Sequence, residues 1–298
     1  DAIHWDKPGL DIEPGTNTVL RHNRDSTTVW LDHNETNPRH RFKMFVTEMV
    51  PDWTPDRYGL FVRTSPDGIH WSDRLTKPVR MGDRSTVHYD PFRAVWVFGI
   101  RHGHDGIGRD RCYRETTEPL ADWEWDADSS HFWVGADPLD PHNPDPKLAA
   151  ENPQLYNLDC MAYESITLGQ FCIWQSEHKE PFGAFPKRNE ILLGYSRDGF
   201  HWHRPDRRPF MGCNAVVQDA WNWGNVQSVG GGCLVVGDQL HFHCSGWTRS
   251  KDPDKPCPVL STGLAILRRD GFASMDAGAV PGTLTTHPVR FSGRYLFL

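Results

Sequence analysis

A short motif, Asp-Gly-x-His-Trp, recurs along the chain and limits the folds that this sequence can adopt. It reads Asp67-Gly-Ile-His-Trp71 and Asp198-Gly-Phe-His-Trp202, and related forms begin at Asp1 and Asp270, so that the spacings are 66, 131 and 72 residues. The spacing of 131 is nearly two periods, and Asp122-Trp-Glu-Trp125 lies close to the place of the intervening copy. Asp-Gly is a strong signal for a tight turn, and each full copy follows an apolar, strand-like run. The repeat therefore predicts strands joined by turns in units of about 66 residues.

A second repeat lies between these copies and has the pattern D-x-x-T-V-x-x-D. It occurs as Asp25-Ser-Thr-Thr-Val-Trp-Leu-Asp32 and as Asp83-Arg-Ser-Thr-Val-His-Tyr-Asp90, each followed by a turn and an apolar strand. A third unit begins at Asp159, which precedes Phe171 by 12 residues, as Asp83 precedes Val95. The repeat predicts that each unit opens with an acidic residue just before its first strand.

Each period then contains about four short strands and almost no helical periodicity, which is typical of a β-propeller blade. Further units begin at Gln227 and Thr285, and five copies of the final strand predict five blades. We expect an all-β, five-bladed propeller in one domain over residues 1–298, with a central funnel. Both ends would fall inside blades, which suggests that the natural protein extends further. An all-β sandwich is the alternative, but it would not explain the regularly spaced copies.

The motif itself is best interpreted as a packing device. Its Asp caps the turn, its Gly takes a positive φ and its Trp buries a large area between blades. We also expect each copy to end in a short strand that contains the Trp. A motif repeated at equivalent positions is a poor candidate for catalysis, because an active site needs different residues in different blades.

Composition excludes several partners. The 298 residues include 32 basic and 39 acidic side chains, for a formal charge of −7, and no Lys/Arg run, which argues against nucleic acid and against an anionic membrane. No apolar stretch approaches the ~18 residues needed to span a bilayer. The 13 Trp residues suit either a packing anchor or the stacking of flat ligands such as sugar rings. Several tryptophans lie outside the repeat and remain free to stack on a sugar, notably Trp30, Trp53, Trp221 and Trp223.

These features together resemble the five-bladed β-propeller glycoside hydrolases, the superfamily of families 32, 43, 62, 68, 117 and 130. The resemblance is one of architecture and motif placement over most of the chain. Those families carry a base or nucleophile Asp in blade one, a supporting Asp in blade two and a general acid Glu in blade three. The first two positions fall on Asp25 and Asp83, and the third falls on Asp159, with Glu164 as its rival. The local sequences depart from the family's Asp-Pro and Asn-Asp-Pro-Asn-Gly signatures, which indicates a divergent branch.

The resemblance implies hydrolysis of a glycosidic bond in a polysaccharide or oligosaccharide. One carboxyl group is kept protonated, a second is ionised, and a third separates their pKa values. It implies a carbohydrate partner, no required cofactor, an optional structural Ca²⁺ and a secreted or periplasmic location, and it leaves the oligomeric state open. An Asp before a strand is also often only a turn cap. Two rival functions are therefore a non-catalytic propeller that binds carbohydrate or protein, and a propeller polysaccharide lyase that would use His102 or His241.

Other polar side chains near the expected strand ends are candidates for substrate binding. Arginines near strand ends suit sugar hydroxyls or an acidic sugar, or else form salt bridges. Neutral amides stand in blade four where the other blades carry acids, beside a Trp that would stack on a sugar. The candidates are Arg24, Arg101, Arg114, Trp223, Asn225 and Gln227.

Metal ligands are not expected. His102 and His104 share one strand face, as do His241 and His243, but neither pair has an obvious third ligand. The seven cysteines contain no C-x-x-C and fit no zinc spacing, so that we expect mostly buried thiols with one or two bridges at most.

Overall fold

Antiparallel strands form four sheets in a computed structural model of the chain, and no α-helix occurs among the residues that it describes. Those residues are 4–21, 24–50, 58–121, 123, 125–126, 129–176, 187–215, 220–229, 231–248, 259–290 and 292–294. Among them, no helix is long and apolar enough to cross a membrane. Pro38–His40 forms a short 3-10 helix.

The four sheets follow one another along the chain, and their strands pair mostly in sequence order. Sheet one contains β1 (Arg24–Leu31), β2 (Phe42–Met49), β3 (Tyr58–Ser65) and β4 (Val79–Arg80). Sheet two contains β5 (Thr86–Asp90), β6 (Val95–His104), β7 (Gly108–Thr116) and β8 (His131–Gly135). Sheet three contains β9 (Ala149–Tyr163), β10 (Ile166–Ser176) and β11 (Asn189–Ser196). Sheet four contains β12 (Gly224–Ser228), β13 (Leu234–Val236), β14 (Gln239–Thr248) and β15 (Val259–Arg268).

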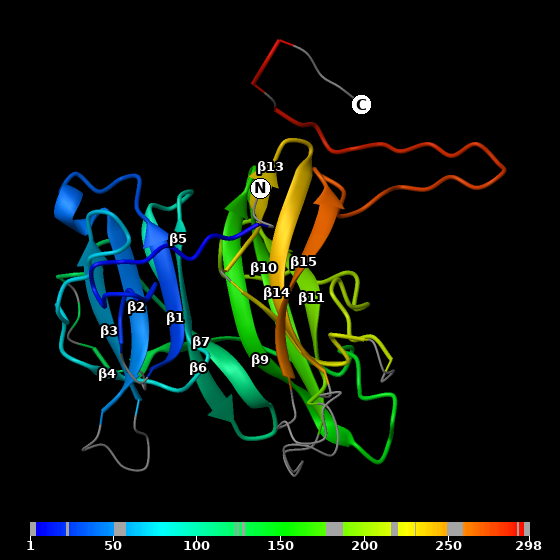
Figure 1. The fold of residues 1–298 in the computed structure, drawn as a ribbon. Helices are drawn as coiled ribbons and strands as arrows, with labels where there is room; N and C mark the ends of the chain where they lie inside the picture. Colours follow the sequence, from blue (N-terminus) through cyan, green and yellow to red (C-terminus); the bar gives the residue numbers. More distant parts are fainter. Residues whose placement is uncertain are drawn as a thin grey trace.

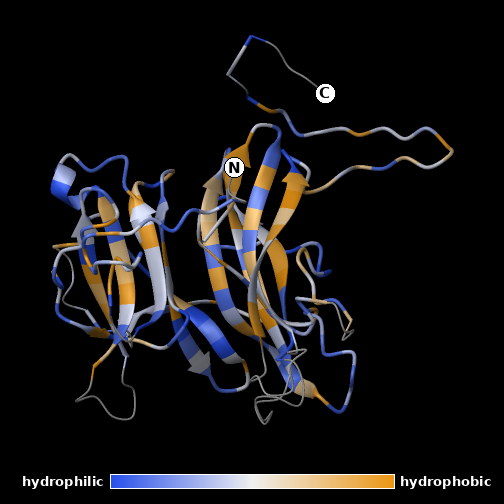
Figure 2. Cartoon of the chain, in the orientation of Figure 1, coloured by the Kyte–Doolittle hydropathy of each residue, from blue (hydrophilic) through white to orange (hydrophobic). Residues whose placement is uncertain are grey.

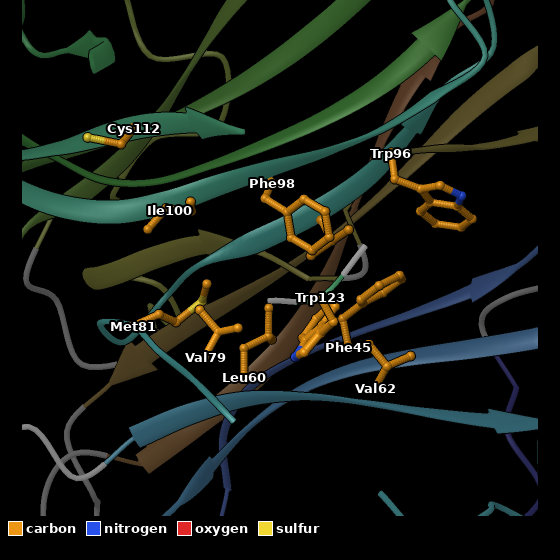
Figure 3. Packing of buried hydrophobic residues seen from close by; sticks show 11 residues of the cluster. Phe45, Leu60, Val62, Val79, Met81, Trp96, Phe98, Ile100, Cys112 and Trp123 are labelled. Atoms are coloured by element: carbon orange, nitrogen blue, oxygen red, sulfur yellow. The ribbon is translucent and has the colours of Figure 1, made fainter. Parts of the chain in front are cut away.

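Neighbouring sheets pack face to face, as blades of a propeller do (Figure 1). One apolar core joins sheets one and two, and its large side chains include Phe45, Trp96, Phe98 and Trp123 (Figure 3). A second core joins sheets two and three, and a third joins sheets three and four. The first strands of the sheets, β1, β5, β9 and β12, together line one cavity between the blades. The all-β propeller prediction is thus confirmed.

The prediction of five blades is wrong, because four sheets account for all the strands among the described residues. The prediction placed the last strand of one blade at the beginning of the chain and the first strands of another from Thr285 onwards. Residues 4–21 and 273–290 contain no strand. Apolar side chains in the second stretch, such as Val280 and Leu284, are 78% and 64% exposed, so that they have no sheet to bury them. A turn motif marks the end of a strand, and it does not report whether a complete sheet surrounds that strand.

The Asp-Gly-x-His-Trp copies form matching turns after β3 and β11. In the first, Oδ1 of Asp67 accepts from the backbone N–H groups of Ile69 and His70, and Gly68 has a φ of 79°. These hydrogen bonds, led by the one from the His70 backbone, hold the pKa of Asp67 well below its usual range. Asp198 and Gly199 repeat the arrangement, with a φ of 77° at the glycine.

The short strand expected within each copy does not form. Trp71 and Trp202 lie just after the turns, outside the strands, and pack against the cores as partly buried side chains. Asp122 and Glu124, from the weakened copy, lie outside the described residues, as do Asp1 and Trp53. The six described cysteines are all free thiols, and Cys257 lies outside the described part of the chain.

Candidate functional site

Two connected cavities lie along the inner strands. The narrower one has a volume of about 270 Å³ and is lined by residues of β1, β5, β9 and β12 together with the loops beside them. The wider one, of about 580 Å³, lies at the far ends of the same strands and shares Trp30, Val229 and Gly231 with the first. All four sheets contribute to the narrower cavity, which makes it the natural candidate for a ligand site.

Asp25 lies near the beginning of β1 and lines the narrower cavity. Its side chain is half-buried, and its Oδ1 accepts a hydrogen bond of 3.3 Å from the backbone N–H of Arg84, just before β5. Arg24 lines the same cavity from an exposed position. The structure therefore places one predicted acid and one predicted arginine at a junction between the first two blades.

Asp83 lies in the turn that precedes β5. Its carboxylate is 30% exposed and forms an ion pair of 3.4 Å with Nε of Arg101, which comes from β6. Asp83 is adjacent in sequence to Arg84, which lines the cavity, but does not line the cavity itself. The Asp83–Arg101 pair thus joins two of the predicted residues beside the cavity.

Asp159 lies well inside β9, ten residues after the strand begins, and lines the cavity. Its Oδ2 accepts hydrogen bonds from the hydroxyl of Ser228 and from the amide of Asn157, the latter at 2.8 Å. Burial raises the pKa of Asp159, and the hydrogen bond from Ser228 and the charge of Arg111 only partly oppose this effect. A carboxyl group in this environment is suited to holding a proton.

Glu164 and Arg114 lie away from the cavities. Glu164 occupies the turn between β9 and β10 with a φ of 51°, and its exposed carboxylate pairs with Arg269 at 3.2 Å. Arg114, on β7, places its guanidinium 4.8 Å from the ring of Trp125. The structure does not bring either residue to the inner strands.

Blade four contributes a network of amides. Gln227 lines the narrower cavity and is buried, and its Nε2 donates to Oδ1 of Asn225 at 2.7 Å. Asn225 is also buried, accepts from Asn189 and has a φ of 48°. Trp223 is only 6% exposed, whereas Trp30 lines both cavities. Trp30 is therefore better placed than Trp223 to stack on a ligand.

The sequence did not single out two arginines that lie among the acids. Arg84 lines the cavity; burial works to lower its pKa, but the Tyr156 phenol and the Asp25 carboxylate outweigh that effect and raise it. Arg111 is completely buried, and burial lowers its pKa to about 10, while Asp83 and Asp159 act to raise it. No local pattern identifies a buried arginine, because its partners come from other blades.

Two hydrogen bonds between neighbouring inner strands indicate the relative levels of the two acids. The backbone N–H of Arg84 meets Asp25, and the hydroxyl of Thr86 donates to the carbonyl of Leu158 at 2.7 Å. Asp159 is thus about three residues further along its strand than the level of Asp25. At about 3.3 Å per residue, this is an offset of about 10 Å along the strands. Such an offset leaves space for a water molecule or a sugar ring between the two carboxyl groups.

The histidines named for a lyase lie in different places. His241 is buried and lines the wider cavity. His102 lies on β6, and it lines neither of these two cavities. His88 does line the narrower cavity, and burial lowers its pKa to about 4, so that the imidazole is neutral near pH 7.

No protein-family model and no curated protein matches the chain. Solved structures do match it. An N-acetylgalactosamine deacetylase from F. plautii, in complex with blood group B trisaccharide, has a TM-score of 0.57 at 13% identity, over 90% of this chain and 79% of that chain. A GH32 β-fructofuranosidase from Bombyx mori has a TM-score of 0.49 at 12% identity, over 82% of this chain and 46% of that chain. The catalytic domain of a GH62 α-L-arabinofuranosidase from Coprinopsis cinerea has a TM-score of 0.35 at 13% identity, over 85% of this chain and 93% of that chain.

At these identities the likeness is one of fold. The F. plautii structure is the only one of these three with a TM-score above 0.5, and it carries the argument. The comparison therefore supports the all-β propeller fold and goes no further.

Proposed function

We propose that this protein is a carbohydrate-active enzyme that hydrolyses a glycosidic bond in the narrower cavity. The observation that carries the proposal is that two acids from different blades, Asp25 and Asp159, line that cavity in contrasting environments. Asp159 has a raised pKa and acts as the general acid, while Asp25, which is half-buried, activates the attacking group. Asp83 tunes the site through Arg101, to which it is paired.

The offset between the acids favours inversion of the anomeric carbon. Retaining enzymes hold their two carboxyl groups about 5 Å apart, whereas inverting enzymes hold them about 6.5–9.5 Å apart, with a water molecule between. An offset of about 10 Å along the strands is twice the retaining spacing and lies just above the upper end of the inverting range. Asp25 is accordingly a general base that removes a proton from water, and Asp159 donates its proton to the departing oxygen.

The test measures release of reducing ends from a panel of plant, algal and microbial polysaccharides. Asp25→Asn and Asp159→Asn should each lower kcat on a responsive glycan by about 10²–10⁴-fold, the usual contribution of a positioned acid or base. Glu164→Gln is the matched control from the same blade, because Glu164 lies in an exposed turn with Arg269. It should keep full activity, and NMR of the first product should show the inverted anomer.

Three outcomes would overturn these assignments. Full activity in Asp25→Asn would show that Asp25 is not the general base. Loss of activity in Glu164→Gln alone would show that Glu164, not Asp159, is the general acid. Release of acetate in place of reducing ends would assign the site to deacylation, a chemistry that the F. plautii neighbour's name contains. Fold alone does not decide between these reactions.

A non-catalytic carbohydrate-binding propeller is the second candidate, because Trp30 lines both cavities and its ring can stack on a sugar. It predicts saturable binding of a glycan without any product. In that case Trp30→Ala should weaken binding, since Trp30 lines both cavities, while Asp159→Asn should have little effect.

A further inference from the structure

The hairpin formed by β6 and β7 extends beyond β5 and gathers four side chains that can bind a metal, while β8 pairs with residues 110–113 of β7. β5 pairs only with residues 95–99 of β6, so that residues 100–112 project past it. In this projection His102 lies opposite Asp110, and Ile100 lies opposite Cys112. One possible ligand atom from each of His102, His104, Asp110 and Cys112 lies within 4.8 Å of all the others.

Two atoms of this cluster are buried without a hydrogen-bond partner among the described residues. Asp110 is 0% exposed, and its Oδ2 accepts from the backbone N–H of His104 at 3.0 Å and contacts Nδ1 of His104 at 2.6 Å. Its Oδ1 has no partner, and neither has Nδ1 of His102. Leaving a buried carboxylate oxygen unsatisfied is costly, so that the arrangement favours a cation at this place.

We propose that this cluster binds one Zn²⁺ ion. Two imidazoles, a carboxylate and a thiolate are ligands that zinc accepts, and four of them complete its tetrahedral shell. Ligand atoms around tetrahedral zinc are separated by roughly 3.5 Å. The largest separation between the four ligand atoms, 4.8 Å, would therefore shorten by about 1 Å when the ion binds. The Cys112 thiol loses its proton to solvent as the metal binds, and the histidines coordinate as neutral rings.

A zinc ion here would act on structure. Four protein ligands leave no open position for substrate, which is typical of structural sites. The cluster is also separate from the narrower cavity, whose lining includes none of the four residues. The ring of Phe132, on β8, packs edge-on against His104 at 5.5 Å and covers one side of the cluster. The ion would hold together a projecting hairpin that β5 does not support, whatever reaction the protein performs.

The third and fourth ligands explain why the sequence did not indicate this site. Considered in sequence, the His102–His104 pair has no nearby ligand on its own strand. Strand pairing places Asp110 and Cys112 on the same face as the pair, because residues directly opposite each other in an antiparallel pair point to the same side of the sheet.

The test titrates metal-free protein, prepared with a chelator and then freed of it, with Zn²⁺ and with Co²⁺ as a coloured substitute. We expect one equivalent of either ion, a Tm that rises until that equivalent is bound, and a thiolate-to-cobalt charge-transfer band. Cys112→Ala should abolish the band. His104→Gln, at a half-exposed position, should weaken binding by at least roughly tenfold.

Matched controls come from sheet four. Cys233→Ala and His243→Gln change a half-exposed cysteine and a half-exposed histidine outside the cluster, and they should leave the stoichiometry and the band unchanged. Because Cys112 packs in the first core, its variant is checked by circular dichroism, and the His104 variant provides the test if Cys112→Ala does not fold. Wild-type protein that binds less than one equivalent, or binds Co²⁺ without the charge-transfer band, would overturn the proposal. So would an equal loss in the controls.

Discussion

Sheets two and four have similar strand layouts but opposite surroundings. Sheet two is covered on both faces, so that Trp96, Val97, Phe98 and Ile100 of β6 are all 3% exposed or less. Sheet four buries one face against sheet three, through side chains such as Leu240 and Phe242. On β13 and β15, apolar residues such as Val235, Leu260 and Ile266 are exposed. Figure 2 shows hydrophobic colouring along β15. The comparison shows that a similar strand pattern forms both sheets. How much each sheet contributes to the free energy of unfolding depends on whether neighbouring sheets cover its faces.

Truncating a core side chain of sheet two should have the largest effect. Phe98 is 1% exposed and packs against Phe45, Trp123 and Trp125 with ring centroids 5.6–6.0 Å apart. Phe98→Ala should lower the free energy of unfolding by about 4 kcal/mol, because it removes buried surface and leaves a cavity. Denaturant titration measures this change. Ile266→Ala in sheet four, where the side chain is 52% exposed, is the control and should cost less than about 1 kcal/mol. Equal losses in the two variants would contradict the comparison.

Ion pairs should follow the same division between covered and exposed positions. Glu48 of β2 is 1% exposed and pairs with Arg63 at 3.0 Å and with Arg74 at 2.5 Å. Glu48→Gln should lower the free energy of unfolding by about 3 kcal/mol, because it removes the buried carboxylate charge that pairs with Arg63 while the amide oxygen keeps one acceptor. Glu164→Gln breaks the exposed pair with Arg269 and should lower the free energy of unfolding far less than Glu48→Gln does. A small loss for Glu48→Gln would mean that water reaches Arg63.

Strands and turns could be predicted from the sequence because their signals are local. Alternating apolar runs and the Asp67-Gly68 turn depend on neighbours within a few residues. The repeat predicted an acid just before each first strand, but Asp25 lies within β1 and Asp159 lies ten residues inside β9, and both line one cavity. The blade count needed contacts between sheets, and the contributions of Arg84 and Arg111 needed strand register. Neither kind of information is present in a single segment of sequence.

Buried histidine should make sheet two sensitive to acid. Burial lowers the pKa of His88 to about 4, below the ~6.5 of an unfolded chain. Between these values the unfolded state binds more protons, so that stability is lost as the pH falls from about 6.5 towards 4. The loss between pH 7 and pH 5 should be about 2 kcal/mol. His88→Gln should remove that part of the pH dependence, as measured by denaturant titration at each pH. His243→Gln, at a half-exposed position on sheet four, is the control and should leave the pH dependence of stability unchanged.

Replacing exposed apolar residues of sheet four should have the smallest effect on folding. Leu260 and Ile266 on β15 are 69% and 52% exposed, so that little burial is lost when Thr, which also favours strands, replaces them. Leu260→Thr and Ile266→Thr together should change the free energy of unfolding by less than about 1 kcal/mol. Binding of a hydrophobic dye should fall in the same variant, because the exposed apolar area of the sheet decreases. A large loss of stability with unchanged dye binding would show that this face is covered in solution, and the contrast between sheets two and four would then no longer hold.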